Sequence, residues 1–254
     1  MSSQAIEMRG IDKRFFGKSD VLALEQVGLA IADNEFAVLL GPSGCGKSTL
    51  MNIVAGFEAA TAGTTRVFGE HVTGPGPDRA VVFQESALFP WLSVWENVVF
   101  GPRLQGMRSA DYESQAQELL DLMGLGEFHK ALPAELSGGM KQRVGIARAL
   151  VMKPRILLMD EPFGALDAQT RLSMQGLLLE VWQRFQKTVL FITHDIDEAI
   201  LLADTVYVMT ARPGRIGVRI PITLPRPRDV DLITDPVFNE LRGRIMRELR
   251  AMSQ

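Results

Sequence analysis

Apolar and polar residues alternate through the first part of the chain in a way that predicts β-structure. The alternation continues into VLALEQVGLAIADNEFAVLL, residues 21–40, which ends in a continuous apolar run and has Asn34 at a turn position. A half-buried strand repeats every two residues, whereas a buried strand is apolar throughout. The pattern therefore predicts antiparallel strands that lead into one buried strand.

Further along the chain the apolar residues change to helical spacing. In DYESQAQELLDLMGL, residues 111–125, apolar side chains cluster between positions 119 and 123, and Gly124 is expected to end the helix. We therefore expect a mostly helical insertion over about residues 87–150.

In the second half of the chain, helical segments alternate with short apolar runs. Residues 140–152 and 166–185 have helical spacing, and the apolar runs at residues 155–160 and 188–193 follow them. Strands that alternate with crossover helices predict a parallel sheet in an α/β core.

The tail, residues 212–254, is rich in proline and ends in a segment with helical spacing. We expect this helix to pack against the core, and we assign the tail no chemistry. The expected contact face is apolar and consists of Phe238, Leu241, Ile245 and Leu249.

Composition places the chain among globular proteins and limits its partners. With 254 residues, of which 46% are apolar and 22% charged, the chain fits one domain over residues 1–254. The formal net charge is -3 and no block of lysine and arginine occurs, so we expect no nucleic acid partner.

Cysteine content and apolar run lengths indicate the compartment. Cys45 is the single cysteine, which excludes an intrachain disulfide and favours a reducing compartment. The first residues lack the pattern of a secretion signal, and no apolar run approaches the roughly 20 residues that cross a bilayer. We therefore expect a chain without membrane spans that can still bind peripherally to a membrane protein.

A glycine-rich loop follows the predicted buried strand. GPSGCGKS, residues 41–48, fits G-x-x-x-x-G-K-[ST] and lies between a strand and a helix, as a phosphate-binding loop requires. We expect Lys47 to bridge the β- and γ-phosphates of a nucleotide, Ser48 to bind Mg²⁺ and Cys45 to act as a small filler. The residues expected to contact the nucleotide here are Gly41, Pro42, Ser43, Gly44, Cys45, Gly46, Lys47, Ser48 and Thr49.

Polar residues end the other apolar strands. Asp160 and Glu161 follow one strand, where Asp160 is suited to hold Mg²⁺ and Glu161 to act as general base toward water. His194 follows the next strand and is expected to contact the γ-phosphate and Glu161. Gln84 closes a further apolar run and is placed to offer its amide oxygen to Mg²⁺ or water. With Lys47, these residues form the predicted catalytic and metal-binding set.

A second serine–glycine turn, LSGG at residues 136–139, opens a predicted helix. Its N–H groups form another anion site, so one chain carries two phosphate-binding sites. With this turn the chain resembles the ATP-binding subunits of ABC transporters, and the resemblance covers nearly the whole chain. It rests on six motifs in the family's order: the phosphate loop, Gln84, LSGG, Asp160 with Glu161, GALD with Asp167, and His194.

The resemblance implies a fold and its ligands. The fold would be an α/β P-loop NTPase core of the ABC ATPase type, with a parallel sheet, an antiparallel β subdomain and a helical subdomain. The ligands would be ATP and Mg²⁺. In the family an aromatic residue stacks on adenine; Phe15 matches best and Phe16 is the alternative.

The resemblance also implies a homodimer that encloses two ATP molecules. The signature turn of one copy, with Ser137, Gly138 and Gly139, would contact the nucleotide held by the other copy. Asp167 would couple the two sites. ATP binding would close the dimer and hydrolysis would reopen it.

No membrane span is fused to this domain, so the family resemblance implies separate membrane partners, as in bacterial importers. These would be two permease subunits and a periplasmic substrate-binding protein, with this chain bound peripherally at the cytoplasmic face of the inner membrane. Residues after Gln84 are expected to form a groove for a short permease helix. They are Phe89, Trp91, Leu92 and Trp95, of which Trp95 fits a core position best.

Three further segments, LFPWLSVWENV, GPGPDRAVVFQ and ARPGRIGVRIPITLPRPRD, resemble the nitrate, sulfonate and taurine importers. A sulfonate such as taurine is therefore the first expected substrate and nitrate the second. A soluble ABC ATPase without a transport function and an exporter subunit would share the same catalytic residues. A GTPase is disfavoured because the N-K-x-D motif that reads guanine is absent.

Overall fold

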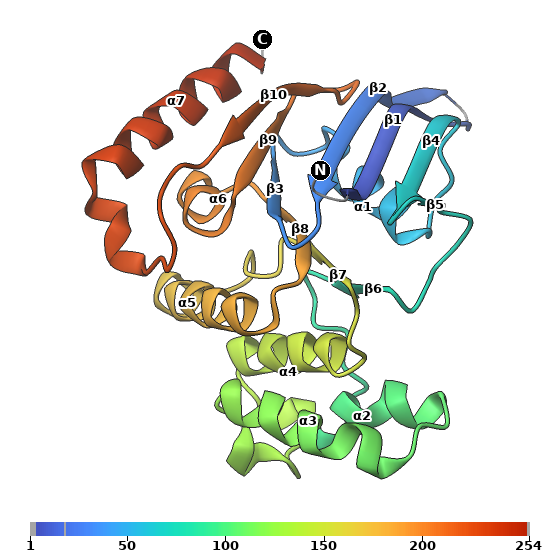
Figure 1. Cartoon of the computed structure of the whole chain (residues 1–254), viewed down its shortest axis with the longest axis vertical. Coiled ribbons are helices and arrows are strands. Elements are labelled where there is room, and N and C mark those ends of the chain that lie inside the picture. Colours follow the sequence, from blue (N-terminus) through green and yellow to red (C-terminus); the bar gives the residue numbers. More distant parts are fainter. Residues whose placement is uncertain (1–3, 18, 253–254) are drawn as a thin grey trace.

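The strands of the computed structural model, which describes residues 4–17 and 19–252, form two sheets (Figure 1). The first sheet is antiparallel, with the order β2-β1-β4-β5. Its strands are β1 (Gln4–Phe15), β2 (Val21–Ala32), β4 (Ala62–Val67) and β5 (Glu70–His71). The long β1–β2 pairing confirms the antiparallel strands predicted for the start of the chain.

The second sheet is parallel except at one edge. It has the order β10-β9-β3-β8-β7-β6, and β10 alone among these strands is antiparallel to its neighbour. β3, β8 and β9 are buried at every position, which explains their largely apolar sequences. The predicted parallel sheet is confirmed. The strands are β3 (Phe36–Leu40), β6 (Arg79–Val82), β7 (Ile156–Asp160), β8 (Thr188–Thr193), β9 (Thr205–Met209) and β10 (Ile216–Pro221).

The helices surround the parallel sheet. Figure 1 shows α2, α3 and α4 at the end of the molecule away from the antiparallel sheet. Within the described residues, no helix combines the length and apolar character needed to span a bilayer. The helices are α1 (Lys47–Ala55), α2 (Val94–Leu104), α3 (Ser109–Leu122), α4 (Gly138–Leu150), α5 (Ala168–Phe185), α6 (Ile196–Leu202) and α7 (Pro236–Met252), with 3₁₀ turns at Gly126–Phe128, Pro133–Glu135 and Val230–Thr234.

Alternate residues of the parallel strands face two separate cores, because side chains of a strand point to opposite faces in turn. On β3, Phe36 and Val38 pack with helices α2 to α6. Ala37 and Leu39 pack with α1 and the antiparallel sheet. α1 is therefore enclosed between the two sheets, on the other face of the parallel sheet from α4.

The carboxyl ends of the central parallel strands lie level with one another. Leu40 of β3 pairs with Thr193 of β8, and Asp160 of β7 pairs with Ile192 of β8. The residues that follow these three strands therefore leave the sheet at the same edge. This is the edge at which open parallel sheets bind ligands.

The helical region between β6 and β7 begins later than expected. α2 starts at Val94 rather than near residue 87, because Ser93 and Glu96 form a capping box in which each side chain accepts from the other's backbone N–H. Residues 83–93 have no regular structure. Gly124 follows α3 with φ of 66°, as expected for a residue that ends a helix.

The tail packs on the core as the apolar pattern predicted. Phe238, Leu241 and Ile245 of α7 are buried, and Leu249 is half-buried against the same core. The α7 face expected from the sequence is therefore confirmed.

Arg228 fastens the segment before α7 to the end of α6. It is 5% exposed, and its guanidinium donates to the carbonyl oxygens of Ala203 at 2.6 Å and Leu224 at 2.8 Å. Further bonds reach the carbonyls of Ile200 and Leu201. Burial lowers the pKa of Arg228 to about 10, so the side chain stays charged at neutral pH.

Arg228→Met is expected to lower the free energy of unfolding by about 3 kcal/mol, because buried carbonyl groups lose their donor. Urea denaturation followed by circular dichroism measures the change. The control Arg244→Met removes an exposed arginine of α7 and should change stability by no more than about 0.5 kcal/mol. Equal stabilities of the two variants would contradict the anchoring role.

Candidate functional site

The phosphate loop connects the buried end of β3 to α1. Gly46 has φ of 103°, and a Cβ atom there would lie 2.7 Å from Leu24 Cδ2. Only glycine therefore lets the loop approach β2 so closely. α1 has no side-chain cap at its N-terminus, so its first N–H groups are free to bind an anion.

Lys47 lies across the phosphate loop. The side chain is buried, and Nζ donates to the carbonyl oxygens of Gly41 at 2.8 Å and Pro42 at 3.1 Å. Beside it, Cys45 is buried, and burial raises the pKa of its thiol despite the opposing charge of Lys47. A protonated, buried thiol fits the role of small filler.

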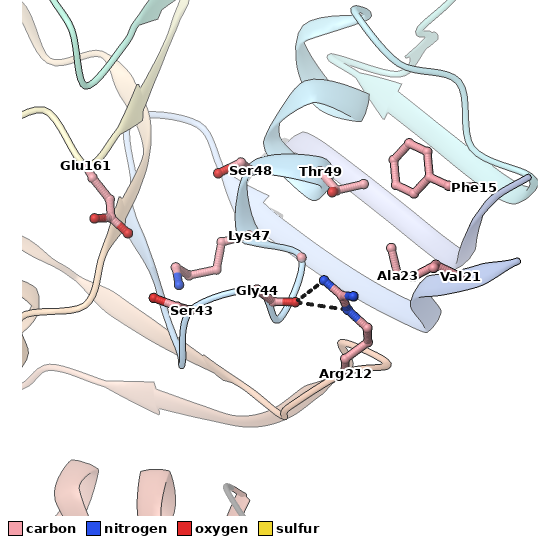
Figure 2. Close-up of a pocket in the computed structure, with 11 residues that line it drawn as sticks. Phe15, Val21, Ala23, Ser43, Gly44, Lys47, Ser48, Thr49, Glu161 and Arg212 are labelled. Atoms are coloured by element: carbon pink, nitrogen blue, oxygen red, sulfur yellow. Dashed lines mark hydrogen bonds between the residues drawn. The ribbon is translucent and has the colours of Figure 1, made fainter. Parts of the chain in front are cut away.

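The loop forms one wall of a pocket whose opposite ends carry Phe15 and Glu161 (Figure 2). Phe15 lines this pocket, whereas Phe16 is 74% exposed and does not. Lys13 Nζ lies 4.9 Å from the centroid of the Phe15 ring and is itself bonded to Glu58 at 2.6 Å. The cation fixes and polarises the ring, which suits Phe15 to stacking on a flat base.

Asp160 lies beside the start of α1. Burial raises the pKa of its carboxyl above the ordinary value of 3.8, and the hydrogen bond with Ser48 opposes this rise. A carboxylate and a hydroxyl side by side are the hard oxygen donors that Mg²⁺ prefers. The donor set therefore fits the predicted cation.

Glu161 points in a different direction from Asp160. Its φ of 43° is in the left-handed region, which a non-glycine residue adopts at a cost, and its N–H donates to Ile192 O at 3.0 Å. This turn brings Glu161 Oε2 to 2.9 Å from His194 Nδ1. The structure thus joins the predicted base and the predicted histidine directly.

Gln84 approaches the same carboxylate across Gly164. A Cβ atom at Gly164 would lie 3.3 Å from Gln84 Nε2 and 3.7 Å from Glu161 Oε2. The exposed glutamine side chain is therefore close to the predicted base, although it does not line the pocket in Figure 2.

The signature turn forms a second group with Asp167. Ser137 caps α4 by accepting from the Met140 N–H at 3.3 Å, and Asp167 caps α5 by accepting from the Thr170 N–H at 3.0 Å. A Cβ atom at Gly139 would lie 2.7 Å from Thr170 Cγ2, so the two helix starts touch. Ser137, Gly138, Gly139 and Asp167 do not line the pocket at the phosphate loop.

The family model described as ABC transporter matches residues 24–164, more than half of the chain. The chain belongs to the ABC transporter family. This confirms the predicted family and with it ATP hydrolysis as the chemistry.

Two relatives and one solved structure are similar to this chain over most of its length. The nitrate import ATP-binding protein NrtD of Synechocystis sp. is 44% identical over 98% of this chain and 99% of its own. The taurine import ATP-binding protein TauB of Jannaschia sp. is 47% identical over 95% of this chain and 92% of its own. A dimeric ATP-binding cassette bound to ADP and Pi has a TM-score of 0.75 at 30% identity, over 87% of this chain and 100% of its own. The predicted fold is thereby confirmed.

An apolar groove lies between β6 and helices α2 and α4. Phe89 and Phe100 form its aromatic wall, with ring centroids 4.5 Å apart, and the Arg148 guanidinium lies 5.9 Å from the Phe89 ring. Trp91 contacts Phe89 but lies outside the groove. Trp95 stacks on His129 and packs against the core.

Of the four groove residues predicted, the structure therefore places only Phe89 in the groove. Leu92 is half-buried and, like Trp91 and Trp95, is not part of its lining. Trp91 and Leu92 precede the Ser93 cap of α2, and Trp95 in the first turn of α2 packs against the core instead. Phe100 on α2 and Arg148 on α4 are among the residues that line the groove with Phe89.

One charged residue of the pocket had no role in the sequence predictions. Arg212, in the tail, lines the pocket and donates to Gly44 O from Nε at 3.3 Å and Nη2 at 3.2 Å (Figure 2). No local pattern brings these residues together, because they are 168 positions apart. The only local signal is that Arg212 precedes a proline–glycine turn after an apolar run.

Asp160→Asn is expected to raise the Tm of the nucleotide-free protein, because it removes a carboxylate whose partial burial disfavours its charge. Because the pKa of Asp160 is raised in the folded protein, its charged carboxylate lowers the free energy of unfolding at neutral pH. This destabilisation disappears as the pH falls below 3.8. The Tm difference from wild type, measured by scanning calorimetry, should therefore shrink between pH 7 and pH 4.

Asp167→Ala is expected to lower the Tm, in contrast to Asp160→Asn. Hydrogen bonds from the Thr170 side chain and backbone lower the pKa of Asp167 and cap α5, so this variant should melt below wild type at pH 7. An Asp160→Asn variant that also melts below wild type at pH 7 would show that burial does not disfavour the Asp160 charge.

Proposed function

We propose that this chain is the ATP-hydrolysing subunit of a bacterial ABC importer. The observation that carries the proposal is the joint position of an uncapped α1, Lys47, the Ser48–Asp160 pair and the Glu161–His194 pair at one edge of the parallel sheet. Each group supplies a part that phosphoryl transfer to water requires.

Nucleotide binding uses groups that the pocket already presents. The backbone N–H groups of residues 43–44 and 46–49 donate to phosphate oxygens, and the Phe15 ring stacks on the base. Lys47 exchanges its bonds to the Gly41 and Pro42 carbonyls for phosphate oxygens. This exchange replaces a neutral acceptor by a charged one, which strengthens the bond.

Ser48, Asp160 and Gln84 are the residues that would hold Mg²⁺. A bound Mg²⁺ would supply positive charge that stabilises the phosphate groups. Asp160 contributes a negative charge from a half-buried position, where its interaction with a cation is stronger than in water.

Glu161 serves as the general base. It accepts a proton from the attacking water, while His194 holds the carboxylate through the bond between Nδ1 and Oε2. Because His194 is largely exposed, its other ring nitrogen remains accessible to the γ-phosphate. Gln84, next to Glu161, helps to orient the water.

We further propose that two copies assemble around two ATP molecules. In one subunit, the signature turn and Asp167 lie on the opposite face of the parallel sheet from α1. A second copy can bring Ser137, Gly138 and Gly139 to the nucleotide. The dimeric structure of the similar cassette supports this assembly.

The groove at Phe89 and Phe100 is the proposed seat of a permease helix. The groove is apolar, and its lining includes Phe83. Phe83 and Gln84 begin the irregular segment before α2, so this segment connects the groove to the ATP site. Two permease subunits would hold the dimer at the cytoplasmic face of the membrane, and a periplasmic binding protein would deliver the substrate. The names of the relatives NrtD and TauB support import.

The proposed substrate is a small anion, with taurine first and nitrate second. Relatives named for each of these substrates are similar to the chain over nearly its whole length, at 47% and 44% identity. The three resembling segments described above favour the same group of importers. The transported anion binds elsewhere, so its identity is tested by transport.

Glu161→Gln is expected to reduce ATP hydrolysis by a factor of about 100 or more, because the base is lost. ATP should still bind and should trap a dimer, visible by size-exclusion chromatography with ATP and Mg²⁺. The contrasting variant Lys47→Ala should instead weaken ATP binding by about 1.5–3 kcal/mol, the value of one charge-assisted hydrogen bond. Wild-type turnover in Glu161→Gln would refute the role of Glu161.

Uptake of labelled taurine by the native host is expected to stop when the gene for this chain is deleted, and to return with the wild-type gene. Phe100→Asp should hydrolyse ATP as an isolated protein yet fail to restore uptake, because a charge in the groove disfavours an apolar helix. Loss of nitrate uptake alone would select the second substrate. Unchanged uptake of both would contradict the proposed import function.

A further inference from the structure

The turn between β9 and β10, residues 210–215, packs directly on the phosphate loop. The Gly214 N–H donates to Ala23 O at 2.9 Å, and the Glu25 N–H donates to Gly214 O at 3.0 Å. A Cβ atom at Gly214 would lie 1.9 Å from Cys45 O. The turn therefore touches the phosphate loop and β2 through backbone contacts.

The position of this turn is fixed without Arg212. Thr210 Oγ1 donates to Pro213 O at 3.1 Å and accepts from the Arg215 N–H at 3.0 Å. Arg215 also forms an ion pair with Glu25 at 2.5 Å. Residue 212 is thus presented at the pocket by a framework of other residues.

The Arg212 side chain is only partly engaged. Its two bonds to Gly44 O share one acceptor and are longer than the usual 2.9–3.0 Å. Nη1 has no hydrogen-bond partner in the described part of the chain. The guanidinium lines the pocket together with Ser43, Lys47 and Phe15, so its remaining donors are available to a ligand (Figure 2).

Arg212 makes the net charge of the pocket lining positive. The charged residues that line the pocket are Lys47, Arg212 and Glu161. Without Arg212 the positive charge of Lys47 would be balanced by Glu161, and Asp160 nearby would add a negative charge. A polyanion binds better where the local field is positive, and arginine suits phosphate because it offers paired N–H donors.

We infer that Arg212 is a nucleotide-binding residue that supplies the second positive charge of the pocket to the phosphate groups of ATP. The inference rests on the proposed function and assigns the tail a part in it. Besides holding the Gly44 carbonyl, the guanidinium interacts with phosphate through its charge. Its contribution should therefore grow with the number of phosphates in the ligand.

Equilibrium titration of the full chain with adenosine, AMP, ADP and the nonhydrolysable analogue AMPPNP, with Mg²⁺ at low salt, tests this inference. Arg212→Ala should raise the Kd for AMPPNP about threefold to tenfold, with a smaller rise for AMP and none for adenosine. Added salt should reduce the difference in AMPPNP Kd between Arg212→Ala and wild type.

Three variants separate charge from loop support. Arg212→Gln retains a donor for Gly44 O but has no charge, so it should bind AMPPNP as weakly as Arg212→Ala. Arg212→Lys keeps the charge and should recover part of the affinity. Arg244→Ala removes a positive charge from an exposed position of α7, outside both the pocket and the turn, and should bind like wild type.

Several results would overturn the inference. These are wild-type affinity in Arg212→Ala, full recovery in Arg212→Gln, an equal loss for adenosine, or an equal loss in Arg244→Ala. Each of them leaves nucleotide binding by the wild-type chain intact and so leaves the proposed function standing. Failure of the wild-type chain to bind AMPPNP would instead overturn the proposed function and this inference with it.

Discussion

The uncapped first turn of α1 is the feature on which the rest of the site depends. α4 and α5 begin with Ser137 and Asp167, whose side chains satisfy N–H groups of the first turn, whereas α1 begins after Gly46 with no such cap. A side chain at Gly46 would strike Leu24, so packing on β2 keeps the capping position empty. Cys45 anchors the loop in the core shared with the antiparallel sheet, while the first N–H groups of α1 stay available to an anion.

The layers of the fold explain why one subunit holds only half of the proposed ATP contacts. α1 belongs to the core shared with the antiparallel sheet, and α4 belongs to the core on the other face of the parallel sheet. The signature turn does not line the pocket of its own subunit, and in the proposed dimer it would meet the phosphate loop of the other copy.

Local patterns predicted the parts of the structure that depend on neighbouring residues. The phosphate loop with its strand and helix, the carboxylates after β7, His194 after β8 and the apolar face of α7 all belong to this class. The edge strand β10, the aromatic wall of the groove and the position of Arg212 depend on contacts between distant segments. Periodicity carries no information on which segment a strand or turn will meet, so these parts required the three-dimensional structure.

Without nucleotide, the site keeps several charged groups in unfavourable surroundings. Lys47 is bonded to carbonyl groups, the Asp160 carboxyl is half-buried, and Glu161 has a left-handed backbone conformation. Binding of a polyanion with its cation stabilises the charges of Lys47 and Asp160. Lys47 gains a charged acceptor, and Asp160 gains a charged partner. A ligand stabilises whichever state provides these contacts, by an amount that its differential affinity sets. In the proposed dimer the closed state would add the contacts of the signature turn to the nucleotide, so ATP binding would supply free energy that closes the two subunits.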